Sequence, residues 1–203
     1  EPRPFQIPSL ETGSLSNGIE VVVSHNSEIP KVNVLLTFGA GSWSDSNESY
    51  GLAMNTMDML DEGTSEYSAA NLATEQKKLA ARISSSSGLD GSYISLSSLK
   101  KNLSESLALF STVVLDPSFP EADWEKMKKK KIQDLQSDKK DPNRIASKIF
   151  RSLLYGDFYA GRQMSEEYYS NITTTQMKEW YTNHIVSNQA KIWISGDIIL
   201  EEI

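Results

Sequence analysis

The 203-residue sequence has no cysteine and only two histidines. The absence of cysteine excludes disulfides, thiolate metal sites and a cysteine nucleophile, and it fits either a cytosolic or an exported protein. His25 lies in a predicted connector and His184 at a predicted helix end. Since neither has a second histidine or a glutamate-rich helix beside it in sequence, we expect surface or capping roles for both rather than metal ligation.

Long apolar runs and an excess of positive charge are also lacking. The sequence has no run of about 18 apolar residues that could span a membrane, and residues 1 to 4 do not begin a signal peptide. The chain has 20 Lys and Arg and 27 Asp and Glu, which gives a net charge of −7. This charge argues against nucleic acid and anionic lipid as partners. One basic cluster, Lys126 with residues 128 to 131, follows acidic residues on a predicted helix, and we interpret it as a solvated helix face.

The remaining composition, 38% hydrophobic and 23% charged, is typical of one globular domain. Residues 1 to 13 are rich in proline, serine and threonine and are interpreted as a linker or an extended lead-in segment, with the folded domain at residues 14 to 203. Because the chain starts without Met and stops where a helix is expected to begin, at Leu200, we expect a piece of a longer polypeptide, truncated at its C-terminus.

Four strands are predicted in the first 100 residues, and a fifth near the C-terminus. Asn17-Gly18 precedes a β-branched strand at residues 19 to 23, which we expect to form an antiparallel pair with residues 32 to 38. Residues 83 to 87 and 93 to 99 flank a loop with glycine at both ends, Gly88 and Gly91, and predict a second hairpin. A last strand is predicted at residues 190 to 195. Gly39-x-Gly41 lacks the further residues of a nucleotide-binding loop and is interpreted as a turn.

Helices are predicted at residues 50 to 61, 69 to 81, 103 to 114, 121 to 138 and 142 to 154, from apolar residues at helical spacing. Thr173-x-x-Gln176 has the form of a capping box and opens a further helix to about residue 183. The order of elements is not the strict alternation that a doubly wound parallel sheet requires. The sequence therefore predicts an α+β fold, a two-layer α/β sandwich with a largely antiparallel sheet.

Residues 51 to 64 read Gly-Leu-Ala-Met-Asn-Thr-Met-Asp-Met-Leu-Asp-Glu-Gly-Thr. This stretch resembles the signature helix of the insulinase (pitrilysin) family of zinc metallopeptidases, in which Gly-Leu-Ala leads into His-x-x-Glu-His and then Met-Leu and Gly-Thr. Further segments match in order and spacing, so that the resemblance runs from about residue 14 to the end: Leu15-x-Asn17-Gly18, Phe38-Gly39-Ala40-Gly41-Ser42, Leu115-Asp116-Pro117-x-Phe119-Pro120, Asp141-Pro142, Tyr155-Gly156-Asp157 and Gly196-Asp197.

The resemblance implies a zinc site whose chemistry this chain lacks. The histidine positions hold Met54 and Asp58, and the position of the glutamate that polarises the attacking water holds Met57. The third ligand of the family is a glutamate in a later helix, and counting along the chain places Asp134 there. We expect Met54 and Met57 to fill space, and Asp58 to find a backbone or cationic partner. No catalytic residue, metal or cofactor is therefore expected in this domain.

The resemblance also implies a role. Active relatives are built from homologous domains arranged as two bowl-like halves that close around a peptide, and often one half alone bears zinc. We expect this chain to be a non-catalytic domain that forms part of the peptide-enclosing chamber, with zinc in a catalytic half in the same chain or in a partner subunit. Bacterial relatives of this type are commonly periplasmic. Two alternatives stay open: a purely structural subunit related to respiratory-complex core proteins, and a divergent metal-dependent hydrolase that uses Asp58 and Asp134.

Overall fold

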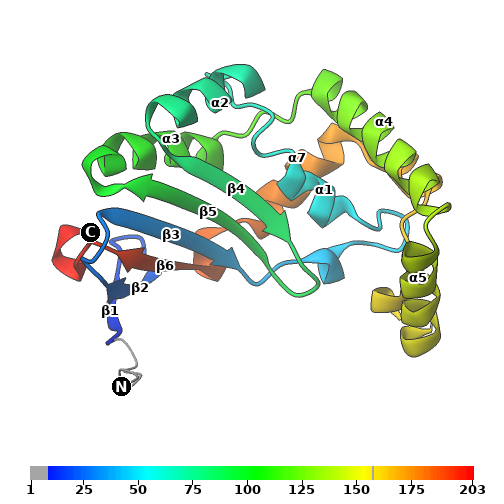
Figure 1. Ribbon diagram of the computed structural model, residues 1–203, viewed down its shortest axis with the longest axis horizontal. Helices are drawn as coiled ribbons and strands as arrows, with labels where there is room; N and C mark the ends of the chain where they lie inside the picture. Colours follow the sequence, from blue (N-terminus) through cyan, green and yellow to red (C-terminus); the bar gives the residue numbers. More distant parts are fainter. Residues whose placement is uncertain (1–8, 157) are drawn as a thin grey trace.

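The computed structural model describes residues 9–156 and 158–203. Residues 1 to 8 of the expected linker, and Asp157 of the Tyr-Gly-Asp segment, lie outside the described residues. A six-stranded, largely antiparallel sheet carries helices on one face, and α4 and α5 lie at the end of the molecule farthest from the two termini (Figure 1). The predicted fold class, an α+β sandwich with a largely antiparallel sheet, is confirmed.

The strands of the sheet follow the order β1-β2-β6-β3-β5-β4. Their bounds are β1 Glu11–Ser14, β2 Glu20–His25, β3 Lys31–Phe38, β4 Arg82–Ser87, β5 Ser92–Leu99 and β6 Ala190–Gly196. Strands β2 and β6 run parallel, and the other neighbouring pairs are antiparallel. The predicted hairpin of β4 and β5 is confirmed, since the N–H of Gly88 donates to the carbonyl of Gly91 at 2.8 Å across its loop.

Strand pairing near the N-terminus differs from the prediction. Strands β2 and β3 do not pair with each other, because β6 lies between them: Trp193 is opposite Val22 on one side and Leu35 on the other. β-Branched runs and turn residues identify strands, but the choice of neighbour depends on a segment more than 150 residues away. A second difference concerns β1, whose residues 11 to 13 were assigned to the linker or lead-in segment and which pairs with β2 as an edge strand.

The helices are α1 Leu52–Asp58, α2 Ala69–Lys78, α3 Leu103–Leu115, α4 Glu121–Asp138, α5 Pro142–Tyr155, α6 Glu166–Asn171 and α7 Thr174–His184. The capping box of α7 is confirmed, since Thr173 and Gln176 each bond the backbone of the other. The short helix α6 has no counterpart in the prediction; its Ser165 cap accepts a hydrogen bond from the Tyr168 amide. The expected helix at Leu200 is a single 3₁₀ turn, Leu200–Glu202.

The core lies between the sheet and the helices that cover it. Alternate residues of β3, Val32, Val34, Leu36 and Phe38, are buried, as the two-residue period of a strand with one covered face requires. Trp124 of α4 is fully buried, and its indole N–H donates to the Ile172 carbonyl at 3.0 Å. Among the described residues, no helix combines the length and the apolar character needed to cross a membrane.

Candidate functional site

Helix α1 carries Met54, Met57 and Asp58, which stand where the family has His-x-x-Glu-His and which we call the degenerate site. The residue before this helix has a backbone conformation that favours glycine. Gly51 has φ +90°, and a Cβ there would lie 2.6 Å from the sulfur of Met164. The Asp45 carboxylate accepts hydrogen bonds from the Gly51 and Ala53 amides at 2.8 and 2.9 Å, and the Tyr159 hydroxyl donates to it at 3.2 Å. Two of the backbone amides at the start of α1, which have no partner within the helix, are thereby satisfied.

Asp45 and Tyr159 both lie in a partly buried environment. Burial raises the pKa of Asp45 to about 6, although the hydrogen bonds from Ala53, Gly51 and Tyr159 each act to lower it. Burial is also the main cause of the raised pKa of Tyr159. The phenol therefore stays protonated at neutral pH and remains available as a donor to the carboxylate.

The loop before Asp45 explains the glycine at position 41. The Ser42 amide donates to the Gly88 carbonyl at 2.9 Å, so the backbone of the β4–β5 loop lies against this turn. A Cβ on Gly41 would lie 2.6 Å from the Gly91 nitrogen, which leaves no room for a side chain. The interpretation of this segment as a turn is confirmed.

The two methionines of α1 differ in their surroundings. Met57 is fully buried in the hydrophobic core, and its carbonyl accepts a 2.6 Å hydrogen bond from the Ser85 hydroxyl of β4. Met54 is only partly buried and lines a cavity of about 410 Å³ together with Tyr50 and Leu135. The expectation of a packing role is confirmed for Met57, whereas Met54 contributes to the wall of a cavity.

Asp58 has the cationic partner that the sequence analysis allowed for. The Lys131 ammonium of α4 lies 2.5 Å from the Asp58 carboxylate, with the two side chains 19% and 33% exposed. Asp134 follows one turn later on α4 and lines the same cavity, of about 430 Å³, as Asp58 and Lys131. The structure thus brings the two candidate carboxylates to one cavity, with an ammonium group paired to one of them.

Two further acidic residues line this cavity and were not singled out from the sequence. Burial raises the pKa of Asp61, and the negative charge of Asp58 adds to the shift. Burial also raises the pKa of Glu62, with Asp61 and Asp123 contributing in the same direction. Both residues belong to the Met-Leu-Asp-Glu-Gly-Thr frame, which was the available signal. The cavity therefore holds several carboxylates, and neighbouring negative charge opposes the ionisation of Asp61 and Glu62.

The basic cluster of α4 departs from the expected solvated face. Besides Lys131, the side chain of Lys128 is 15% exposed, and its ammonium lies 5.4 Å from the centroid of the Trp124 ring. Lys126 does lie on an open face, 76% exposed and paired with Asp123. The interpretation is wrong for Lys128 and Lys131, because the long aliphatic stems of lysine can pack against apolar neighbours while the ammonium finds a partner.

Comparison with known proteins addresses the resemblance directly. The family model for insulinase (peptidase family M16) matches residues 20–170 of this chain. The chain belongs to the insulinase family. No curated protein shows significant similarity to it. The matched range contains α1, most of the sheet and α4, so it includes Met54, Met57, Asp58 and Asp134.

Solved structures with this fold are numerous. An inactive domain of a peptidase M16 from Pseudomonas fluorescens is 26% identical, with a TM-score of 0.87, over 96% of this chain and 48% of that one. The same fold occurs in a protease from Helicobacter pylori, at 16% identity and a TM-score of 0.85, over 97% and 48% of the two chains. The periplasmic protease PqqL from Escherichia coli shows 18% identity and a TM-score of 0.83, over 97% and 23%. The chain spans about half or less of the length of these structures.

The donor set of this insulinase-family domain does not fit the family's zinc. Thioethers replace one histidine and the glutamate, and the carboxylate at the second histidine position is bound to an ammonium. Across residues 9–156 and 158–203, no group of three or more histidine, aspartate and glutamate side chains could hold a metal ion.

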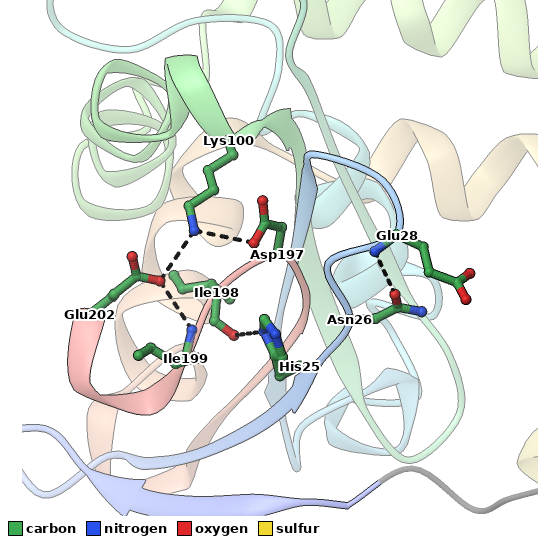
Figure 2. A network of polar contacts seen from close by, with 8 residues as sticks. All are labelled: His25, Asn26, Glu28, Lys100, Asp197, Ile198, Ile199 and Glu202. Atoms are coloured by element: carbon green, nitrogen blue, oxygen red, sulfur yellow. Dashed lines mark hydrogen bonds and ion pairs between the residues drawn. The ribbon is translucent and has the colours of Figure 1, made fainter.

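Both histidines bond backbone carbonyls far from α1 in sequence. The His184 Nδ1 lies 2.9 Å from the Trp180 carbonyl, and its ring stacks on the Trp180 ring at the end of α7. The His25 Nδ1 lies 3.0 Å from the Ile198 carbonyl, next to the pairing of Lys100 with Asp197 at 3.2 Å (Figure 2). The predicted surface or capping role agrees with these contacts.

Proposed function

We propose that this chain is a non-catalytic domain of a zinc-dependent insulinase-family peptidase, which forms part of a peptide-enclosing chamber and works beside a catalytic half that carries the zinc. The observation that carries the proposal is the ion pair between Asp58 and Lys131 at a position where the family places a zinc ligand. A fixed ammonium neutralises the carboxylate and competes with any cation for its oxygens.

The replacement of the family's catalytic glutamate by Met57 also supports a non-catalytic role. A thioether cannot accept a proton near neutral pH, so Met57 cannot activate a water molecule. Its complete burial also keeps it from a bound peptide. The helix therefore keeps Met57 in the hydrophobic core and supplies none of the groups that the family's hydrolysis requires.

The similar structures support the proposal that this chain belongs to one half of a two-half peptidase. The Pseudomonas fluorescens structure is described as an inactive domain, and a structure described as the first half of PqqL matches 95% of this chain at 19% identity. We infer that the catalytic partner lies in the same chain or in a partner subunit, and that a peptide is the substrate of the assembly. Because PqqL is described as periplasmic, the periplasm is the proposed location.

The test compares this chain with its proposed partner. Purified chain is analysed for zinc by mass spectrometry and for hydrolysis of a fluorogenic peptide with and without EDTA, alone and together with the His-x-x-Glu-His domain encoded in the same chain or beside it. We expect less than about 0.1 zinc per chain and EDTA-sensitive hydrolysis only when the partner is present. One tightly held zinc with EDTA-sensitive hydrolysis by this chain alone would overturn the proposal.

A divergent hydrolase is the second candidate, and one observation favours it: Asp58 and Asp134 line the same cavity as Asp61 and Glu62. The double substitution Asp58→Ala with Asp134→Ala separates the two functions. If the cavity were catalytic, metal-dependent hydrolysis by the chain alone would fall at least about 100-fold. If the domain is non-catalytic, activity of the mixture with the partner is kept.

A further inference from the structure

Helix α5 turns its apolar side chains to solvent. Leu153 is 80% exposed, Phe150 64% and Leu154 59%. Within residues 142 to 155, all of which the structure describes, none is buried. We define the α5 face as the outward apolar residues at helical spacing, Ile145, Ile149, Phe150, Leu153 and Leu154.

The polar side of the same helix contacts the segments that flank it in sequence, the end of α4 and residues 160 and 161. The Lys148 ammonium pairs with Asp138 at 3.0 Å, and the Ser152 hydroxyl donates to the Gly161 carbonyl at 3.1 Å. The Arg151 guanidinium donates to the Ala160 carbonyl at 3.2 Å. Lys148 and Ser152 are the two least exposed positions of the helix. The usual orientation of a surface helix, apolar side inward, is therefore reversed in α5.

This orientation cannot be explained by the stability of the chain alone. An isolated helix of about 14 residues is marginal in water, and helices in proteins gain most of their stability by burying an apolar stripe. Two aromatic side chains extend the exposed apolar surface nearby: Phe158 and Trp43, 57% and 59% exposed, with an edge-to-face contact at 6.1 Å between ring centroids. Phe158 lies close to the end of α5, since its amide donates to the Tyr155 carbonyl at 3.1 Å. Exposed apolar surfaces of this kind mark sites of association.

We propose that the α5 face is a docking surface for a second folded insulinase-family domain; the identity of this occupant rests on the proposed function above. The solved relatives indicate its size. In the Pseudomonas fluorescens and Helicobacter pylori structures, the part equivalent to this chain is 48% of the whole, so a comparable length of polypeptide accompanies it there. Domain interfaces within one chain bury roughly 600–1,500 Å² and need an apolar centre.

Two other occupants fit the surface less well. Self-association through one helix of about 21 Å would offer little area against the roughly 800 Å² per partner that stable dimers bury. A membrane surface would need cationic side chains beside the apolar stripe, but Lys148 and Arg151 are engaged with the domain, and the chain carries a net charge of −7. Both occupants are outcomes of the experiment below.

The experiment identifies what lies on the face. A photo-crosslinking amino acid replaces Leu153, and in a control it replaces Leu115, which is 79% exposed at the end of α3, a helix that Figure 1 shows well apart from α5. The chain is irradiated with the His-x-x-Glu-His domain and with vesicles of phosphatidylglycerol and phosphatidylethanolamine. We expect a crosslink from position 153 to the partner domain and none from position 115. A crosslink from 153 to a second copy or to lipid, or no crosslink, overturns the proposal.

Affinity then separates this inference from the proposed function. Leu153→Glu should weaken binding of the partner domain about 30-fold, since it places a carboxylate at the centre of an apolar interface, whereas Leu115→Glu should change it less than about 2-fold. Both variants should keep the wild-type melting temperature because both positions are exposed. Equal affinity of Leu153→Glu and wild type for the partner domain would contradict the docking surface. It would not contradict the proposed function, which is tested separately by the zinc content and the hydrolytic activity of the chain alone.

Discussion

Consecutive helices α4 and α5 use their side chains in opposite ways. Helix α4 is rich in lysine, yet it buries Trp124 and directs Lys131 to Asp58 of α1. Helix α5 has a clear apolar side, yet it contacts the domain through Lys148 and Ser152. The difference indicates that contacts within this domain stabilise the degenerate site, whereas the apolar side of α5 is available to a partner domain.

The largest expected effect is at the buried centre of the degenerate site. Met57→Glu would place a carboxylate at a fully buried position and should lower the free energy of unfolding by about 3 kcal/mol. Met57→Leu keeps the volume and should cost less than about 1.5 kcal/mol. Urea denaturation followed by circular dichroism measures both. Equal midpoints for the two variants would show that position 57 is not enclosed.

The next effect concerns the link between α1 and α4. Lys131→Met leaves the Asp58 carboxylate without its partner and should cost about 1 kcal/mol, a moderate value because both side chains are partly exposed to solvent. Adding Asp58→Asn to this variant should recover most of the loss, and a double-mutant cycle of urea midpoints gives the coupling. Additive single effects would count against the ion pair. Lys129→Met, at an exposed position, is the control.

A pH-dependent effect should follow from Asp45 at the start of α1. Its folded-state pKa of about 6 lies above the ordinary value of 3.8, so its contribution to stability is full below pH 3.8 and is lost as the pH rises through 6. Between about pH 4 and 6.5, the wild type should therefore lose stability relative to Asp45→Asn. Asp61 and Glu62 shift in the same direction but are present in both proteins. Parallel pH profiles would contradict the assignment.

The smallest expected effect is on α5. Leu153→Gln should change the free energy of unfolding of the isolated chain by less than about 0.5 kcal/mol, because the side chain is 80% exposed. The same substitution at Leu109, which is 6% exposed in α3, should destabilise the chain far more. Thermal melts of the two variants make the comparison. A large loss at Leu153 would show that the α5 face is covered within this chain.

Features of the fold with local causes could be predicted from the sequence. The bounds of α4 agree with the predicted range, because Pro120 precedes the helix and the polar Lys139-Lys140-Asp141-Pro142 segment follows it. The capping box at Thr173 and the hairpin around Gly88 are equally local. The position of β6 between β2 and β3 was not predictable in this way, since it depends on contacts between distant segments.

By itself, the sequence determined most of the elements, the family frame and the loss of the His-x-x-Glu-His side chains at Met54, Met57 and Asp58, because these depend on residue type and spacing. Only the tertiary structure decided that Lys131 pairs with Asp58, 73 positions away, and that α5 turns its apolar side outward. An amphipathic pattern specifies two sides of a helix, but which side meets the domain depends on the contacts made by its neighbours in space.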